Sequence, residues 1–236
     1  MTETATEPGP RRADAGTVRL SQRDITGLVL CAEHAGAPYD LLATALRAEP
    51  ARLRGIVARW RAAGYAETGR LGPGPAWCWL TPAGMTAAGL GYPAGCPPLA
   101  RLDHLRAVLA VRLWFTGNPS WDTHQGWWQS ERRIRRTGPA AGTHRPDAEI
   151  WWPSLTGSPY AGQIWAVEVE LTAKHAARTA AIMAGLTAPA GYTHVYYLTA
   201  PAARGVVDRC AAALPGDAPA RLTVWDLPPA APTPGT

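Results

Sequence analysis

Apolar and polar residues follow a helical period through most of the first 90 positions. The pattern predicts a helix that begins after Ser21, a second over about residues 39–47, and a third that runs from Pro50 to about residue 64. Serine before a helix and proline in its first turn are typical helix starts. The third helix buries one stripe and carries basic side chains on both sides of it. The stripe consists of Leu53, Ile56, Val57 and Trp60, and the flanking residues are Arg52, Arg54, Arg59 and Arg61.

Two short apolar strands with a Gly/Pro turn follow the third helix, and Thr81-Pro82 then starts one more short helix. The order helix, helix, basic helix and hairpin resembles a winged helix-turn-helix. The string RWRAAGYAETGR…WCWLTPAG is similar to the end of that fold in many bacterial regulators, and the resemblance covers about residues 18–91. It implies that the third helix enters a major groove of DNA and that Arg70 lies on the wing. Two alternatives stay open: the arginines only solvate the helix, or the module binds protein.

The second half begins after a Gly/Pro-rich segment, residues 88–99, that is typical of a linker. A long amphipathic helix is expected over residues 99–115, followed by a strand and a basic turn. Two further strands joined by a Pro/Gly hairpin come next, and then helix, strand, helix and strand. The expected order is α-β-β-β-α-β-α-β, which places the chain in the α/β (α+β) class. We expect domains at residues 18–92 and 98–228, with disordered tails at 1–17 and 229–236.

The most informative stretch of the second half is QIWAVEVELTAK, residues 163–174. Strand alternation puts Glu168 and Glu170 on one face, while the apolar residues around them face the other way. Thr172 is expected to cap a helix over residues 173–188, with Lys174 in its first turn. The chain has 23 lysine and arginine residues, and Lys174 is the only lysine. A compact ammonium with an adjustable pKa is something arginine cannot supply, so its place beside two acids indicates a site.

A third acid, Asp147, stands at the start of an earlier strand in the string HRPDAEIWW. With Pro146-Asp147 as the "PD" and Glu168 as the second acid, the second half resembles the PD-(D/E)XK nuclease superfamily. That family places lysine two residues after the second acid, where this chain has Glu170, and the lysine comes four residues later at Lys174. The resemblance implies that Asp147 and Glu168 bind Mg²⁺ or Mn²⁺. Glu170 is then a third ligand or the base for the attacking water, and Lys174 stabilises the transition-state charge. Merely solvated acids at strand ends are the alternative.

Both halves together resemble the actinobacterial replication-relaxation family, which is linked to the MOBC-type relaxases of conjugative plasmids and integrative elements. The strings that carry this resemblance are DHLRAVLAVRL, WWQSERRIRR, HRPDAEIWW and AVEVELTAKHAAR. It implies an endonuclease or nickase that acts on mobile-element DNA at a transfer or replication origin. The alternative is a non-catalytic DNA-binding regulator or replication accessory protein on a decayed nuclease scaffold. The expected partner is double-stranded DNA, single-stranded at the nick, and the sequence leaves a homodimer and conjugation or replication partners open.

Basic residues of the second half are candidates for contacts with the DNA backbone, with a solvated charge run as the alternative. They are Arg132, Arg133, Arg135, Arg136 and Arg178. Trp121, Trp127 and Trp128 lie beside this run, where an exposed indole could stack on an unpaired base. The six histidines are widely separated along the chain, which argues against a relaxase of the histidine–metal type.

The composition adds few further limits. A net charge of +5 permits an acidic partner such as nucleic acid. The four cysteines lack the spacing of a zinc site or of a disulfide framework. No apolar run reaches the length of a membrane span, and the polar N-terminus does not resemble a signal peptide. We therefore expect a cytoplasmic protein that does not act at a membrane.

Overall fold

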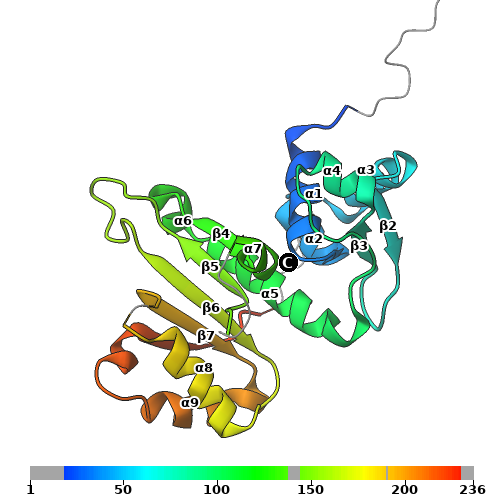
Figure 1. Ribbon diagram of the computed structural model, residues 1–236. Helices are drawn as coiled ribbons and strands as arrows, with labels where there is room; N and C mark the ends of the chain where they lie inside the picture. Colours follow the sequence, from blue (N-terminus) through cyan, green and yellow to red (C-terminus); the bar gives the residue numbers. More distant parts are fainter. Residues whose placement is uncertain (1–18, 138–143, 190, 230–236) are drawn as a thin grey trace, which may run out of the picture.

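The computed structural model describes residues 19–137, 144–189 and 191–229 of the chain. Within these ranges the protein is a mixed arrangement of helices and strands with two separate sheets, one in each half (Figure 1). The predicted tail 1–17 lies outside the described residues, as does the predicted tail 229–236 except for its first residue. No helix in the described part of the chain is long and apolar enough to cross a membrane.

The first half packs four helices around a small antiparallel sheet with the strand order β1-β3-β2. The predicted order of helices and hairpin is confirmed, but strand β1, a two-residue segment that pairs with β3, was not expected. The elements are α1 (Gln22–Glu33), β1 (Ala37–Pro38), α2 (Tyr39–Ala45), α3 (Pro50–Ala62), β2 (Ala66–Gly69), β3 (Trp77–Leu80) and α4 (Pro82–Ala87).

Local sequence signals explain how α1 begins and how it meets α3. Ser21 caps α1 and forms a capping box with Asp24. The buried Asp24 also accepts hydrogen bonds from the indole of Trp60, at 2.8 Å, and from Arg59, at 2.7 Å, both on α3. A Cβ atom at Gly27 would lie 2.5 Å from the Trp60 ring, so only glycine permits this close approach of the two helices.

The second half is built on a five-stranded sheet with the order β4-β5-β6-β7-β8. Strand β5 runs antiparallel to both of its neighbours, β4 and β6, whereas β6, β7 and β8 run parallel to one another. The elements are a 3₁₀ turn η1 (Leu99–Arg101), α5 (Leu102–Thr116), α6 (Pro119–His124), β4 (Trp127–Ser130), α7 (Glu131–Thr137), β5 (Ala148–Trp151), β6 (Ile164–Glu170), α8 (Ala176–Leu186), β7 (His194–Thr199), α9 (Pro201–Ala212), a 3₁₀ turn η2 (Ala218–Arg221) and β8 (Leu222–Asp226).

The two faces of this sheet carry different cores, and β6 contributes alternate residues to each. Val167 and Val169 pack on the face covered by α5. Ala166 packs with residues of α8 and α9 on the other face, which is the face that Glu168 and Glu170 share by alternation. The predicted alternation of this strand is therefore confirmed.

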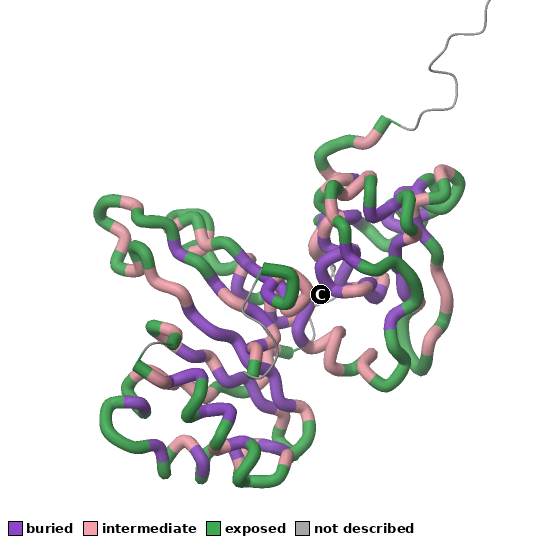
Figure 2. The backbone as a smooth tube through the Cα atoms, viewed as in Figure 1, coloured by how far each residue is buried: buried purple, intermediate pink, exposed green. Residues whose placement is uncertain are grey.

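Helix α5 joins the two halves because it has two apolar faces instead of the single predicted stripe. Leu109 is part of the core of the first half, whereas Val108, Val111 and Phe115 belong to the core of the second. Ion pairs link α5 to the first half as well, between Arg106 and Asp40 and between Arg112 and Glu33. Figure 2 shows buried and intermediate residues on both sides of this junction.

The segment expected to be a linker packs against the first half. Tyr92 is buried in the core of that half, and the N–H of Gly95 donates to the carbonyl of Leu80. Arg132 on α7 donates to the carbonyls of Ala32 and Pro93, which fastens the second half to the same surface. The two halves therefore form one packed body.

Two further expectations about the second half are corrected. The basic run after β4 is helix α7 and not a turn, because Ile134 packs inward while the charged residues around it stay at the surface. The helix after β6 begins at Ala176 with His175 as its N-cap, so Thr172 does not cap it. Lys174 consequently lies in the loop before the helix and not in its first turn.

Candidate functional site

The sheet register brings two of the predicted acids together. Ala148 on β5 pairs with Val167 on β6, and continuing this antiparallel register by one residue sets Asp147 opposite Glu168. The backbone N–H of Val169 donates to Asp147 Oδ2 at 2.8 Å, which fixes one oxygen of this carboxylate. Asp147 therefore lies at the end of the sheet where β6 and β7 finish.

Lys174 completes the cluster from the loop that follows β6. Its Nζ atom is 2.6 Å from Glu170 Oε2 and 3.7 Å from Glu168 Oε1. Both glutamates are buried, with Glu168 only 2% exposed. The structure thus brings the four predicted site residues to one place, although Lys174 reaches it from a loop.

Two histidines that lie far apart in the sequence also belong to this cluster. His104, near the start of α5, lies 2.8 Å from Asp147 Oδ1, and His144 lies 3.0 Å from Glu168 Oε2. The hydrogen bond that His144 donates to Glu168 raises the pKa of His144. Burial acts to lower the pKa of His104, but the hydrogen bond and charge of Asp147 outweigh it, so that pKa is also raised. Each acid therefore holds an imidazole that protonates readily.

Glu168 lies in an environment that opposes its negative charge. Burial raises its pKa, and the nearby charge of Asp147 raises it further against the hydrogen bond from His144 and the positive charge of Lys174. Tyr197 approaches from β7, where its buried hydroxyl donates to Glu170 Oε2 at 3.2 Å. Burial and the neighbouring acids raise the pKa of Tyr197, so this residue stays a neutral donor in the core.

The donor chemistry of the cluster fits a hard divalent cation. Two carboxylates on adjacent strands are what Mg²⁺ usually takes from a protein, the rest of its ligands being water and substrate phosphate. The raised pKa of Glu168 has the same implication, since a cation would offset the repulsion between Glu168 and Asp147. Among the described residues, no group of three or more His, Cys, Asp or Glu side chains is arranged to hold a metal. The fit therefore rests on the Asp147–Glu168 pair.

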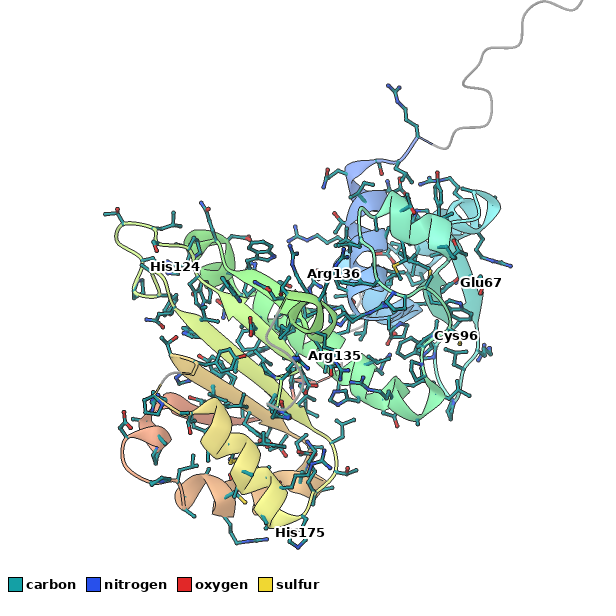
Figure 3. All side chains as sticks on the ribbon, in the orientation of Figure 1. Glu67, Cys96, His124, Arg135, Arg136 and His175 are labelled. Carbon is teal, nitrogen blue, oxygen red and sulfur yellow. The ribbon has the colours of Figure 1, made fainter. Side chains whose placement is uncertain are left out.

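Asp147 and His104 also face a cavity of about 720 Å³ between the two halves. Its basic lining includes Arg101, Arg135 and Arg136. Figure 3 shows Arg135 and Arg136 on α7, on the side towards the first half. Asp147 is therefore reached from a partly basic cleft.

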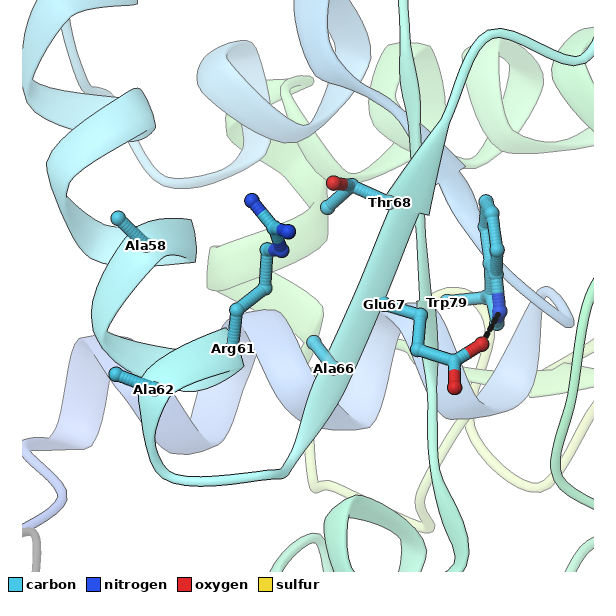
Figure 4. A pocket seen from close by; sticks show the side chains of 7 residues that line it. All are labelled: Ala58, Arg61, Ala62, Ala66, Glu67, Thr68 and Trp79. Carbon is cyan, nitrogen blue, oxygen red and sulfur yellow. Dashed lines mark hydrogen bonds between the residues drawn. The ribbon is translucent and has the colours of Figure 1, made fainter.

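The predicted DNA-binding arginines of the first half are all exposed. Arg52 and Arg54 lie on the surface of α3, Arg59 is ion-paired to Asp24, and Arg70 donates weakly to the carbonyl of Gly74 in the hairpin turn. Arg61 extends from the end of α3 towards β2 and lines a cavity of about 610 Å³ with Glu67, Thr68 and Trp79 (Figure 4). The hairpin and α3 thus present basic groups on one half of the molecule.

The arginines of the second half differ more in their surroundings. Arg132 is held by carbonyls of the first half, and Arg133 lies 3.8 Å from Glu33. Arg135 pairs with Glu131, which also pairs with Arg101. Arg136 and Arg178 are exposed. Arg132 is therefore a contact between the halves, while Arg135, Arg136 and Arg178 stay at the surface.

The spacing of His104 and His144 in the sequence does not predict that they contact the acidic cluster. His144 stands three residues before Asp147, and His104 opens the amphipathic helix that covers the sheet. Both contacts depend on tertiary packing, since His104 and Asp147 are 43 positions apart. No family model matches this chain, and no curated protein or solved structure matches it.

Proposed function

We propose that this protein binds DNA through its first half and hydrolyses phosphodiester bonds in its second half with the help of Mg²⁺ or Mn²⁺. The observation that carries the proposal is the convergence of Asp147, Glu168, Glu170 and Lys174 at one end of the five-stranded sheet. Buried acids beside an ammonium and two imidazoles stabilise a fold poorly, and perturbed groups of this kind cluster at functional sites.

The arrangement of elements supports the same assignment. A helix packed on three antiparallel strands, followed by a helix and parallel strands, resembles the PD-(D/E)XK architecture with Asp147 and Glu168 at its acidic positions. The first half has the helix, helix, helix and hairpin order of a winged helix-turn-helix, with exposed arginines on α3. In that fold the third helix enters the major groove, so Arg52, Arg54 and Arg61 would contact DNA.

The residues of the site divide the chemistry among them. Asp147 and Glu168 would hold the ion, which when bound polarises a phosphate and lowers the pKa of water. Val169 N–H and His104 orient Asp147, and His144 orients Glu168. Glu170 would be a third ligand or would accept a proton from the attacking water, while Lys174 would stabilise the charge that develops on the phosphate oxygens.

The biological substrate follows from the resemblance of both halves to the replication-relaxation family. We propose that the DNA belongs to a mobile element and is nicked at a transfer or replication origin. The basic cleft between the halves supports this reading, since it leads from the first half to Asp147 and His104.

Supercoiled plasmid tests the activity directly. Purified full-length protein with Mg²⁺ or Mn²⁺ should convert it to nicked circles, and Asp147→Asn should reduce the rate by about 10²-fold or more. Glu149→Gln is the matched control, because Glu149 lies on the same strand but bonds to Trp151 and Tyr192 instead. Equal rates for Asp147→Asn and wild type would overturn the assignment of the site.

One observation favours a second candidate function, a non-catalytic DNA-binding protein. Every acid of the cluster already accepts from a protein donor, and the described residues include no three-ligand metal group. DNA binding without nicking under either metal, together with no metal-dependent rise in melting temperature, would support this candidate.

A further inference from the structure

Two tryptophans of the second half form an exposed pair on neighbouring strands. Trp127 on β4 and Trp151 on β5 are direct cross-strand partners, and they are 52% and 39% exposed. Trp128, by contrast, is buried in the core, and Trp121 packs edge-on against Trp152 with ring centroids 5.7 Å apart. Among the tryptophans beside the basic run, Trp127 is therefore the one that presents its indole to solvent.

The pair lies on the same face of the sheet as the acidic cluster. Trp151 pairs with Ile164 and Glu149 with Ala166, so alternation puts Trp127 and Trp151 on the face that carries Glu168 and Glu170. Helices α8 and α9 cover this face only over the strands that follow, because the core they form includes no residue of β4 or β5 among those described. In Figure 1 these helices lie below β6 and β7, away from β4.

Positive charge adjoins the indoles. The Arg133 guanidinium lies 4.6 Å from the centre of the Trp127 ring, and helix α7, which follows β4 directly, exposes Arg135 and Arg136. Aromatic side chains beside basic groups are the recurring composition of surfaces for single-stranded nucleic acid, where bases stack and the backbone charge is neutralised. A dry protein interface would instead have to bury the charge of Arg133 and of Glu149, which bonds to the Trp151 indole.

We propose that Trp127 and Trp151 form a stacking platform for unpaired bases of the DNA strand next to the scissile phosphate. The proposal rests on the proposed function for its substrate, and it adds that the strand is single-stranded where it crosses β4 and β5. Trp151 stands four residues along β5 from Asp147, about 13 Å in an antiparallel strand. This separation allows the platform to hold bases beside the cluster without entering it.

The test measures binding of a fluorescein-labelled oligonucleotide of mixed sequence to the full chain in EDTA, by fluorescence anisotropy. Trp127→Ala and Trp151→Ala should each weaken binding by about 5- to 100-fold, while Trp127→Phe should keep most of the affinity. Trp114→Ala is the matched control. Trp114 is 43% exposed and pairs edge-on with Trp225, but no cation–π contact of the described residues involves either ring.

The outcomes separate this proposal from the nuclease assignment, because binding in EDTA needs no cleavage. Loss of single-strand affinity in Trp127→Ala but not in Trp114→Ala supports the platform even if no variant nicks DNA. Unchanged affinity in folded Trp127→Ala and Trp151→Ala overturns it, whether or not the wild type nicks. If the tryptophan variants change only the self-association of the protein, as measured by sedimentation, the platform is also overturned. The pair is then assigned to a protein interface.

Discussion

Glu33 and Glu168 are both buried glutamates beside a histidine, but the protein surrounds their charges in opposite ways. Glu33, 4% exposed at the end of α1, lies 2.8 Å from Arg112 and 3.8 Å from Arg133. Glu168 has a second acid as its neighbour, the imidazole of His144 at 3.0 Å and one ammonium at 3.7 Å, and its pKa is still raised. The first charge is fully matched where two halves meet. The second is under-compensated, which is the arrangement expected where a cation is to bind.

The pKa values of the histidines at the two places shift in opposite directions. Burial and the positive charges of Arg112 and Arg132 lower the pKa of His34 well below its ordinary value. Negative neighbours raise the pKa of His144 and of His104. The sign of the local charge therefore differs between a junction that holds the fold together and a cluster that we assign to chemistry.

The largest expected effect is a difference in stability between variants of the two glutamates. Glu33→Gln leaves the buried guanidinium of Arg112 without its carboxylate, which should lower the free energy of unfolding by about 3 to 5 kcal/mol. Glu168→Gln keeps the shape and removes a charge that burial disfavours, so the stability should be unchanged or higher. Urea unfolding of both variants checks this contrast. Equal losses would mean that Glu168 is also a structural charge.

The two cations offer the next test, because one place uses a guanidinium and the other an ammonium. Lys174→Arg should reduce nicking by about 10²-fold, since a planar, longer side chain cannot occupy the place of Nζ beside Glu170. Arg112→Lys should cost stability while leaving nicking by the folded protein unchanged. Plasmid-nicking rates of the two variants, normalised to the amount of folded protein, test this contrast. Lys174→Arg at the wild-type rate would reduce Lys174 to a structural counter-ion.

Local signals predicted the first half well and the site only in part. Ser21, Pro50 and Thr81 mark helix starts that the structure confirms, because capping depends on neighbouring residues. The alternation of β6 likewise placed Glu168 and Glu170 on one face. These features are readable because they span a few residues.

What escaped prediction depends on packing between distant segments. The second apolar face of α5, which buries Val111 and Phe115, exists because the helix serves two cores, and a single amphipathic stripe does not describe that case. The roles of His104 and His144 follow from the β5–β6 register and from where α5 docks. The sequence around Arg132 predicts a surface arginine, because nothing in it indicates the contacts with the carbonyls of Ala32 and Pro93.

The smallest expected effect is a difference in pH dependence. His104 and His144 have raised pKa values in the folded protein, so their stabilising contribution is complete below the unfolded value of about 6.5 and is lost as the pH rises through the folded values. His34 has a lowered pKa, so its contribution is present above about pH 6.5 and is lost as the pH falls towards the folded value. His104→Gln with His144→Gln should therefore remove stability chiefly at acidic pH, whereas His34→Gln should reduce the sensitivity of the fold to acid. Melting temperatures between about pH 5 and pH 8 measure both slopes.

The site histidines should contribute modestly, because both are partly exposed and water screens their charge. Parallel slopes in the two variants would show that the junction and the cluster do not differ in local charge, and would remove the physical basis for treating them as different kinds of site.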